Sequence, residues 1–406
     1  MLFHRIWIKK KYVSSLALCV LLICKMAMAD TSVSSTKNPA VFIEMPILSH
    51  PSETAEMNAW FFQFLPRLEG NAMEVLSTQY PSLSKFALGR FTEWTLNLAW
   101  KIPFSVFQHE LGHYMAARSI GYEGKITLTG LSSGYTEYSR PSDSNLWNPE
   151  DMLILSKAGL NQQQLNAMTL YSLWALDGSI TYQEGLAYLM QPTSFLYYCL
   201  KSAHSRNQPS GASPRDDIYV YQQSLQAPVS IDSLVLLSTL PMLLSGGFWA
   251  AVLGQLDFLQ SGHRRISMPT IKLGEARITA PNLHVFLGLQ GPIIGGRMFV
   301  LFERKPALEV GIDVSYAQTK VVALFTKVHG LRLCPWLSIS PFIRTSFSFT
   351  EPWGISVGSD VSIQVHNRLQ WIFRASYDRN DLLMAPLLHQ NGLNLLMSLA
   401  FSIGTS

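Results

Sequence analysis

The segment ISVGSDVSIQVH (355–366) alternates apolar and polar side chains along its whole length. Successive side chains of a β-strand point to opposite faces, so this pattern predicts a strand with one apolar and one polar face. The apolar face would carry Ile355, Val357, Val361, Ile363 and Val365, and the polar face Ser356, Gly358, Asp360, Ser362, Gln364 and His366. The same alternation recurs in LEVGIDVSY (308–316), in WLSISPFIRTSFSF (336–349) and in the final segment around 393–403.

The repeated alternation leaves two β folds open, a membrane barrel and a soluble β domain, because both place apolar residues on one face. Each apolar face here is aliphatic or aromatic over about 10–12 residues, the length of a tilted membrane-spanning strand, and the other face is rich in small polar groups. Roughly eight such strands fit into residues 263–406, which resembles the small β-barrels of bacterial outer membranes. We therefore expect an antiparallel barrel there.

The N-terminus reads as a signal peptide. A basic head (Arg5, Lys9, Lys10 and Lys11) precedes the apolar run VSSLALCVLLIC (13–24), and Ala27-Met28-Ala29 forms an A-x-A cleavage site. The run is short for a bilayer span, so residues 1–29 predict export, with a retained anchor as the alternative.

The composition points to a membrane rather than to nucleic acid. Removal of residues 1–29 takes away five positive charges and no acids, so the formal net charge falls from +4 to −1 and gives no basis for nucleic-acid binding. Charged residues make up 14% and apolar ones 48%, against about 25% charged in typical soluble proteins. Cys199 and Cys334 remain after processing, and their spacing does not decide whether they pair.

The middle of the chain reads as mainly helical. We expect a long helix over 88–122 with an interruption or kink near Pro103, a hairpin over 125–138, a helix from Pro149 to Asp177 and another over 182–203. A final helical run spans about 231–259, and its part 233–254 contains no charged residue. That part fits either a bilayer-spanning helix or a buried central helix.

The sequence HELGH (109–113) lies in the second half of the first long helix. His109 and His113 are one turn apart, so their imidazoles can bind one metal ion, for which Zn²⁺ is the usual choice. In HExxH helices the glutamate, here Glu110, acts as general base toward a water whose pKa the metal lowers to about 7. A chance match is the alternative, but three adjacent ionisable groups in an apolar segment are costly unless they are paired or bind a metal.

HELGHYMAARSIGY (109–122) resembles the first core helix of the intramembrane site-2 zinc metalloproteases, and SSGYTEY (132–138) and AGLNQ (158–162) follow in a similar order. The resemblance covers residues 103–178. It implies zinc bound by His109 and His113, Glu110 as the base, and hydrolysis of peptide bonds.

The third metal ligand departs from that family, in which an L-D-G motif supplies an aspartate. Leu176-Asp177-Gly178 matches the letters, but Asp177 would lie about 24 Å along its helix from AGLN, at the wrong end. If the helices alternate in direction, the next return to the HELGH level brings Asp217 close, which we favour as the ligand. The other candidates are His204, Asp216, Asp232 and Asp257.

The predicted fold class is α+β, with a helical HExxH metallopeptidase-like domain before a C-terminal antiparallel barrel. The expected units are the signal peptide (1–29), an N-terminal mixed segment (30–88), the helical metal-binding domain (89–262) and the barrel-like domain (263–406). The favoured function is a zinc metallopeptidase of the outer membrane, in contact with lipid, whose periplasmic-side catalytic helices act on peptides or proteins of the cell envelope. The alternatives are an inner-membrane site-2-type protease with a periplasmic β domain, and a non-enzymatic barrel protein with a degenerate motif.

Overall fold

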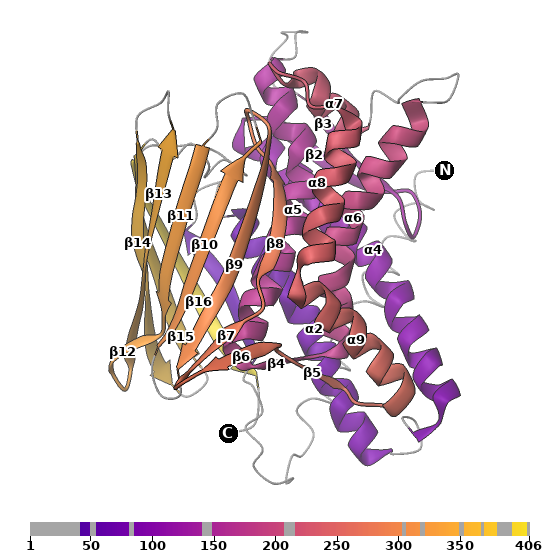
Figure 1. Cartoon of the computed structure of the whole chain (residues 1–406), viewed down its shortest axis with the longest axis vertical. Helices are drawn as coiled ribbons and strands as arrows, with labels where there is room; N and C mark the ends of the chain where they lie inside the picture. Colours follow the sequence, from indigo (N-terminus) through magenta and orange to yellow (C-terminus); the bar gives the residue numbers. More distant parts are fainter. Residues whose placement is uncertain are drawn as a thin grey trace, which may run out of the picture.

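The structure is a computed structural model. It describes residues 41–48, 54–80, 85–139, 148–206, 216–302, 306–316, 321–348, 353–366, 369–379 and 392–403. The predicted signal peptide lies outside these residues. A curved sheet and a group of helices pack side by side (Figure 1).

The described helices are α2 (Thr54–Gln79), α4 (Ala87–Ser119), α5 (Pro149–Asp177), α6 (Tyr182–Arg206), α7 (Asp217–Ser224), α8 (Ile231–Leu244) and α9 (Gly246–Ser261). The ends of α5 follow local chemistry: the side chain of Asn148 caps its N-terminus, Pro149 occupies its first turn, and Gly178 ends it with a φ of +76°. α4 continues through Pro103 as one helix. α2 and α7 are helices that the sequence analysis did not anticipate.

The large sheet has twelve strands in the order β1-β16-β15-β14-β13-β11-β10-β9-β7-β6, with β8 paired to β9 and β12 to β13. Its strands are β1 (Val41–Leu48), β6 (Thr270–Leu273), β7 (Ala276–Thr279), β8 (Asn282–Leu287), β9 (Pro292–Phe302), β10 (Ala307–Ser315), β11 (Val321–His329), β12 (Leu331–Cys334), β13 (Leu337–Ser348), β14 (Gly354–His366), β15 (Leu369–Arg379) and β16 (Gly392–Ile403). Two short sheets pair β2 (Glu123–Leu128) with β3 (Gly134–Ser139) and β4 (Ser179–Thr181) with β5 (Arg265–Ser267).

The antiparallel sheet agrees with the prediction, but its size and closure do not. Residues 263–406 supply eleven of its strands rather than about eight, β1 adds a twelfth, and among the described residues the sheet forms no closed barrel. β1 comes from the N-terminal segment and pairs with β16 near the end of the chain. β1 contacts α2, β8 contacts α5, and α2 and α5 contact each other. Helices therefore contact the sheet at β1, one of its edge strands, and at β8, which pairs with β9 alone among the described strands.

Asn161 of α5 fixes the helices to the sheet. Its buried side chain donates a hydrogen bond to the carbonyl of Leu287 (2.9 Å) and accepts one from the Leu287 N–H (2.7 Å), as a neighbouring strand would do. Both backbone groups of a fully buried residue are satisfied in this way. The helical part and the sheet are thus joined through specific polar contacts in addition to apolar packing.

The sheet has its polar side chains inside and its apolar side chains outside. On β10, Glu309 and Asp313 are buried, whereas Ile312 and Val314 are 47% and 39% exposed. On the neighbouring strands the buried polar residues are Arg344, Ser346 and Ser356, and the exposed apolar ones are Leu324, Ile343, Ile355 and Val357. A sheet that faces water on one side has the opposite arrangement.

Inside the curved sheet, charged groups are paired with each other. The carboxylate of Asp313 accepts two hydrogen bonds from Arg297 (3.0 and 2.8 Å) and one from Arg344 (3.0 Å), and it lies 3.1 Å from His284 Nε2. Glu309 lies 2.7 Å from His329. Each of these groups would be costly to bury alone, so the network stabilises the polar interior as a unit.

The helical run over 231–259 is broken rather than continuous. α8 ends at Leu244, α9 begins at Gly246, and the two are bent by 66°. Across the described part of the chain, no individual helix has the length and apolar character needed to cross a membrane, whereas α8 and α9 taken together do. The run is also not a buried central helix, because seven of its large apolar side chains are exposed.

Candidate metal centre

Three side chains from two helices point at one another. His109 Nε2 and His113 Nε2 lie 3.0 Å apart, and Asp217 Oδ2 lies 3.0 Å from the first and 3.1 Å from the second. Both histidines are buried, and about one fifth of the Asp217 side chain is exposed. The structure therefore places Asp217, rather than Asp177 or Asp257, beside the two imidazoles.

Local structure at the start of α7 positions Asp217. The side chain of Asp216 caps this helix by accepting a hydrogen bond from the Tyr219 N–H (2.9 Å), so Asp216 is a capping residue. Ile218 and Tyr221 anchor α7 in a buried apolar cluster with Phe195 and Leu234. The Tyr221 hydroxyl donates to the carbonyl of Gly288 (2.9 Å). Asp217, as the first residue of an anchored helix, is consequently held at the HELGH level.

Two glycines allow α4 and α5 to pack closely at this level. A Cβ added at Gly112 would lie 2.8 Å from the carbonyl oxygen of Ala158 and 3.1 Å from Gly159 Cα. A Cβ added at Gly159 would lie 2.5 Å from His113 Nε2 and 2.6 Å from His109 Cε1. The shortest of these distances, 2.8 Å at Gly112 and 2.5 Å at Gly159, are below those of real Cβ contacts, so both positions require glycine. The Ala158-Gly159 pair of AGLN therefore forms one wall of the site.

The three donors suit a small divalent cation. Zinc ligands at about 2.0–2.2 Å from the metal lie about 3.3–3.5 Å apart in a tetrahedral arrangement, close to the separations found here. The donor atoms all lie within 4.8 Å of one another. His113 Nδ1 lies 2.7 Å from the carbonyl oxygen of Leu155, to which it can only donate, so the tautomer with a free Nε2 is favoured. Two imidazoles and one carboxylate form a common ligand set for zinc.

The two histidines are held in different ways. His109 Nδ1 has no hydrogen-bond partner among the described residues. Its ring instead stacks on Tyr198 of α6, with centroids 4.7 Å apart and an interplanar angle of 15°. Contact with an aromatic face therefore orients His109, whereas a hydrogen bond orients His113.

The electrostatics of the site follow from the buried charges. Burial alone would lower the pKa of His113, but the charge and hydrogen bond of Asp217, helped by Glu110, raise it to about 9. Burial alone would raise the pKa of Asp217, but His113 and His109 hold it below its ordinary value. Burial and the charges of Asp217 and Glu110 raise the pKa of Tyr138, which remains a neutral hydroxyl. The carboxylate is thus ionised and available to a cation.

Glu110 lies beside this cluster and is held by the β2–β3 hairpin. Thr136 Oγ1 is 2.9 Å from Glu110 Oε2 and 3.0 Å from the Glu110 carbonyl oxygen. A Cβ added at Gly134 would come within 3.2 Å of Glu110 Cγ, so the hairpin contacts the side chain directly. Among the described residues, no lysine or arginine forms an ion pair with Glu110. Its carboxylate is oriented but not neutralised.

The other candidate ligands lie elsewhere. Asp177 forms an ion pair with Arg67, which also bonds Glu184. Asp257 lies 3.0 Å from His263 in an exposed pair, Asp232 lies in the first turn of α8, and His204 lies in the last turn of α6. Cys199 and Cys334 are both free thiols. The sequence analysis missed the roles of Thr136, Gly159 and Tyr198: the first two lie in the SSGYTEY and AGLN segments, and no sequence signal pointed to Tyr198.

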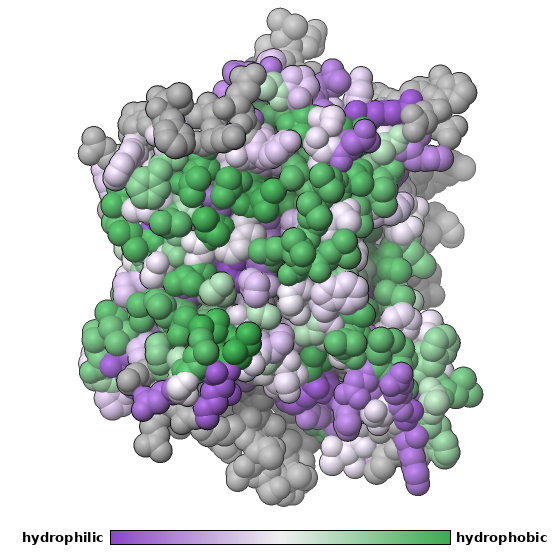
Figure 2. Space-filling view, viewed as in Figure 1, coloured by the Kyte–Doolittle hydropathy of each residue, from purple (hydrophilic) through white to green (hydrophobic). Residues whose placement is uncertain are grey.

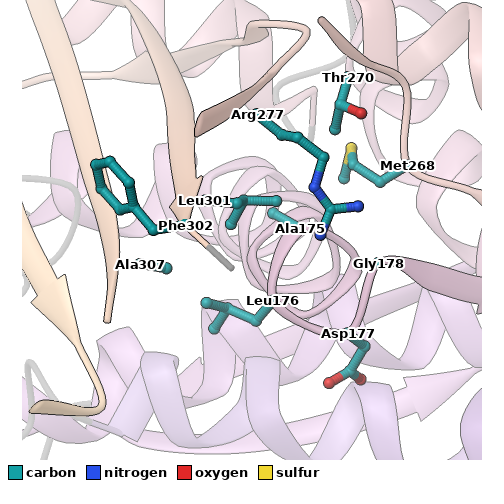
Figure 3. A pocket seen from close by; sticks show the side chains of 10 residues that line it. All are labelled: Ala175, Leu176, Asp177, Gly178, Met268, Thr270, Arg277, Leu301, Phe302 and Ala307. Carbon is teal, nitrogen blue, oxygen red and sulfur yellow. The ribbon is translucent and has the colours of Figure 1, made fainter. Parts of the chain in front are cut away.

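A cavity of about 240 Å³ lies at the opposite end of α5 (Figure 3). Asp177 and Gly178 line it from α5, and Arg277 and Phe302 from the sheet. Figure 3 shows Arg277 extending toward the end of α5 while Asp177 points away from the arginine. The metal candidates His109, His113 and Asp217 are not among its lining residues.

Comparisons with known proteins do not place the chain in a family. No protein-family model matches it, and neither does any curated protein. A match among solved structures is the solution NMR structure of the de novo designed TMB2.3, at 10% sequence identity over 32% of this chain and 94% of that chain. The TM-score is 0.16, too low to support a conclusion about fold.

Proposed function

We propose that this protein is a zinc-dependent peptidase of the bacterial envelope, in which His109, His113 and Asp217 bind the metal and Glu110 is the general base. One observation carries the proposal: Nε2 of both histidines and Oδ2 of Asp217 converge within about 3 Å, beside a carboxylate that belongs to the same HExxH helix. The donors come from segments about one hundred residues apart, so the HELGH sequence alone does not account for their meeting.

Each residue has a distinct role in this proposal. A zinc ion bound there would supply Lewis-acid polarisation of the peptide carbonyl. Glu110 takes a proton from the attacking water and delivers it to the leaving amine, and the hydrogen bond from Thr136 fixes the carboxylate for both transfers. Asp217 contributes a negative charge to the ligand set, and Leu155 keeps the His113 tautomer that leaves Nε2 free.

We also propose that the curved sheet faces lipid as the wall of an outer-membrane barrel does, although its described strands do not close it. The support is its polarity: Ile312, Val314 and Leu324 are exposed, while Asp313 and Arg344 are buried. The paired charges inside fill the interior, so a barrel of this kind would act as a scaffold for the helices rather than as an open pore. The substrate would then be a peptide or protein of the envelope.

Metal analysis with activity measurements tests the site. We expect His109→Ala and Asp217→Asn to lose stoichiometric zinc, and Asp257→Asn, an acid at the opposite end of the helices, to keep it. Glu110→Gln should retain zinc and lose cleavage of labelled casein in detergent micelles. Stoichiometric zinc in His109→Ala would refute the metal site, and full activity in Glu110→Gln would refute the assigned base.

Membrane fractionation tests the placement. We expect the protein to float with outer-membrane markers. Recovery at inner-membrane density would favour an inner-membrane protease instead, and an inactive wild-type protein with bound zinc would favour a non-enzymatic role.

A further inference from the structure

The outer face of α8 and α9 is apolar although the other described residues do not cover it. Residues 233–254 contain no charged side chain, and the stretch lies between Asp232 and Asp257. The exposed side chains are Leu236, Leu240, Leu243 and Leu244 on α8, and Trp249, Leu253 and Leu256 on α9, each between 42% and 65% exposed. They recur every three or four residues, so they form one stripe along each helix.

Three polar side chains along these helices, Ser238, Ser245 and Gln255, point inward. Gln255 is buried, donates to the carbonyl of Tyr182 (2.8 Å) and accepts from the indole N–H of Trp94 (3.1 Å). Ser238 is buried and bonds the carbonyl of Val235, and the buried Ser245 bonds Asn282 (3.2 Å). A helix that faces water would place these groups outside and the leucines inside. α8 and α9 therefore have the same inverted polarity as the sheet.

The inverted face of the helices continues onto the sheet. α8 contacts β8 and β9, so helix and sheet are direct neighbours. Figure 2 shows hydrophobic residues spread over both, with hydrophilic residues gathered toward the top and bottom of this view. On the sheet the exposed residues include Ile312 of β10 and Leu324 of β11, which lie opposite each other on these neighbouring strands.

We propose that α8 and α9 lie in the same lipid bilayer as the outer face of the sheet, with acyl chains covering both. A protein partner would explain one apolar patch. The apolar outer face instead extends from α9 and α8 across β10 and β11 to Ile343 of β13 and Ile355 of β14. Only a solvent that surrounds the molecule covers so many elements at once. The inference rests on the lipid-facing sheet proposed above and extends it to the helical part.

The dimensions agree with this placement. α8 and α9 have 14 and 16 residues, so they extend about 21 and 24 Å, each less than the roughly 30 Å of a hydrocarbon core. Their 66° bend lets the pair line the protein without either helix crossing alone. One carbonyl at the break is protected, because Trp249 Nε1 donates to the carbonyl of Leu243 (2.8 Å).

Spin-label accessibility in vesicles tests the proposal. The protein carrying Cys334→Ser is reconstituted in phosphatidylcholine and phosphatidylglycerol vesicles, and Leu240→Cys, Leu253→Cys, Ile312→Cys and Leu131→Cys are labelled in turn. The protein with Cys334→Ser alone reports background labelling of the remaining thiols. Leu131 is the matched control, because it is an exposed leucine on the hairpin loop between β2 and β3.

We expect labels at Leu240 and Leu253 to relax several-fold more with dissolved oxygen than with a water-soluble nickel complex, as at Ile312, and the label at Leu131 to show the reverse. Water-like values at Leu240 and Leu253 with a lipid-like value at Ile312 would overturn this inference and leave the lipid-facing sheet standing. Protection from both reagents at Leu240 and Leu253 would also overturn it, because protein would then cover the face. Water-like values at all four positions would refute the proposed membrane placement, and zinc content would test the metal site independently.

Discussion

Gly159→Ala should disrupt the metal centre although residue 159 carries no ligand. The added Cβ would lie 2.5 Å from His113 Nε2, 2.6 Å from His109 Cε1 and 2.7 Å from His109 Nε2, against ordinary contacts of 3.4 Å or more. The two rings or the whole of α5 must therefore move by about 0.7–0.9 Å. Metal–ligand distances tolerate about 0.2 Å, and altered support of ligands typically lowers metal affinity 10–100-fold. We expect a loss of zinc affinity at the upper end of that range.

A competition assay with a chromophoric zinc chelator measures the effect, and circular dichroism reports whether the helices persist. Gly130→Ala is the matched control, because its Cβ would meet only the Ser133 hydroxyl, at 3.1 Å, in an exposed turn. We expect zinc affinity in that variant to equal the wild-type value. If Gly159→Ala folds and binds zinc within threefold of wild type, then close approach of α5 does not shape the site, and the assignment of both imidazoles to one cation fails with it.

Three further predictions concern pH, docking and the buried charges. In the folded protein the pKa of His113 is about 9, above its ordinary value of 6.5. In protein stripped of metal by a chelator, protonated His113 therefore stabilises the fold fully below about pH 6.5. That contribution, about 3 kcal/mol, is lost as the pH rises to 9, and thermal unfolding should show the decline in wild type but not in His113→Gln. Asn161→Ala leaves the buried N–H and carbonyl of Leu287 unpaired, so the free energy of unfolding should fall by roughly 1–3 kcal/mol for each group in a denaturant titration, and an unchanged midpoint would contradict the docking role. Asp313→Ala removes the buried carboxylate that bonds both Arg297 and Arg344, and the same titration should show a loss of about 3–5 kcal/mol, whereas a neutral result would mean that water reaches the interior.

Much of the secondary structure could be predicted from the sequence because the patterns that determine it are local. Alternation in ISVGSDVSIQVH predicts a strand with two different faces, and in the structure Ser356 is buried between the exposed Ile355 and Val357. Pro149 and Asp177-Gly178 marked both ends of α5 because caps and turns depend on a few neighbouring residues. The break at Ser245 also had local signs, since Pro241, Gly246 and Gly247 surround it.

Long-range pairing could not be read in the same way. VFIEMPIL (41–48) has no strong alternation, and its pairing with β16 joins opposite ends of the chain. Such a strand is fixed by the free edge it meets rather than by its own pattern. Residues 263–406 supply eleven of the twelve strands, of which β6, β7 and β12 have only four residues each, and β1 supplies the twelfth.

The third donor of the candidate metal centre could be predicted from the sequence, because counting the helices up and down brings the start of α7 to the HELGH level. What could not be inferred is why the donors meet so closely. That depends on Gly159 facing the imidazoles across a helix contact, and a glycine in AGLN is indistinguishable in sequence from one that merely ends a turn.

The low charge content of the chain has one structural explanation, which applies to the helices and to the large sheet alike. Charged and amide groups are concentrated inside, as in the Asp313 network of the sheet and around Gln255 in the helices, while the outward faces of both are apolar. The proposed hydrolysis nevertheless needs water at the candidate metal ligands, and of these Asp217 has a partly exposed side chain, about one fifth open. It lies at the start of α7, just before Asp232 marks the beginning of the uncharged stretch of α8. If acyl chains cover that stretch, the metal ligands open near its boundary with water, so a substrate would reach them from the membrane surface.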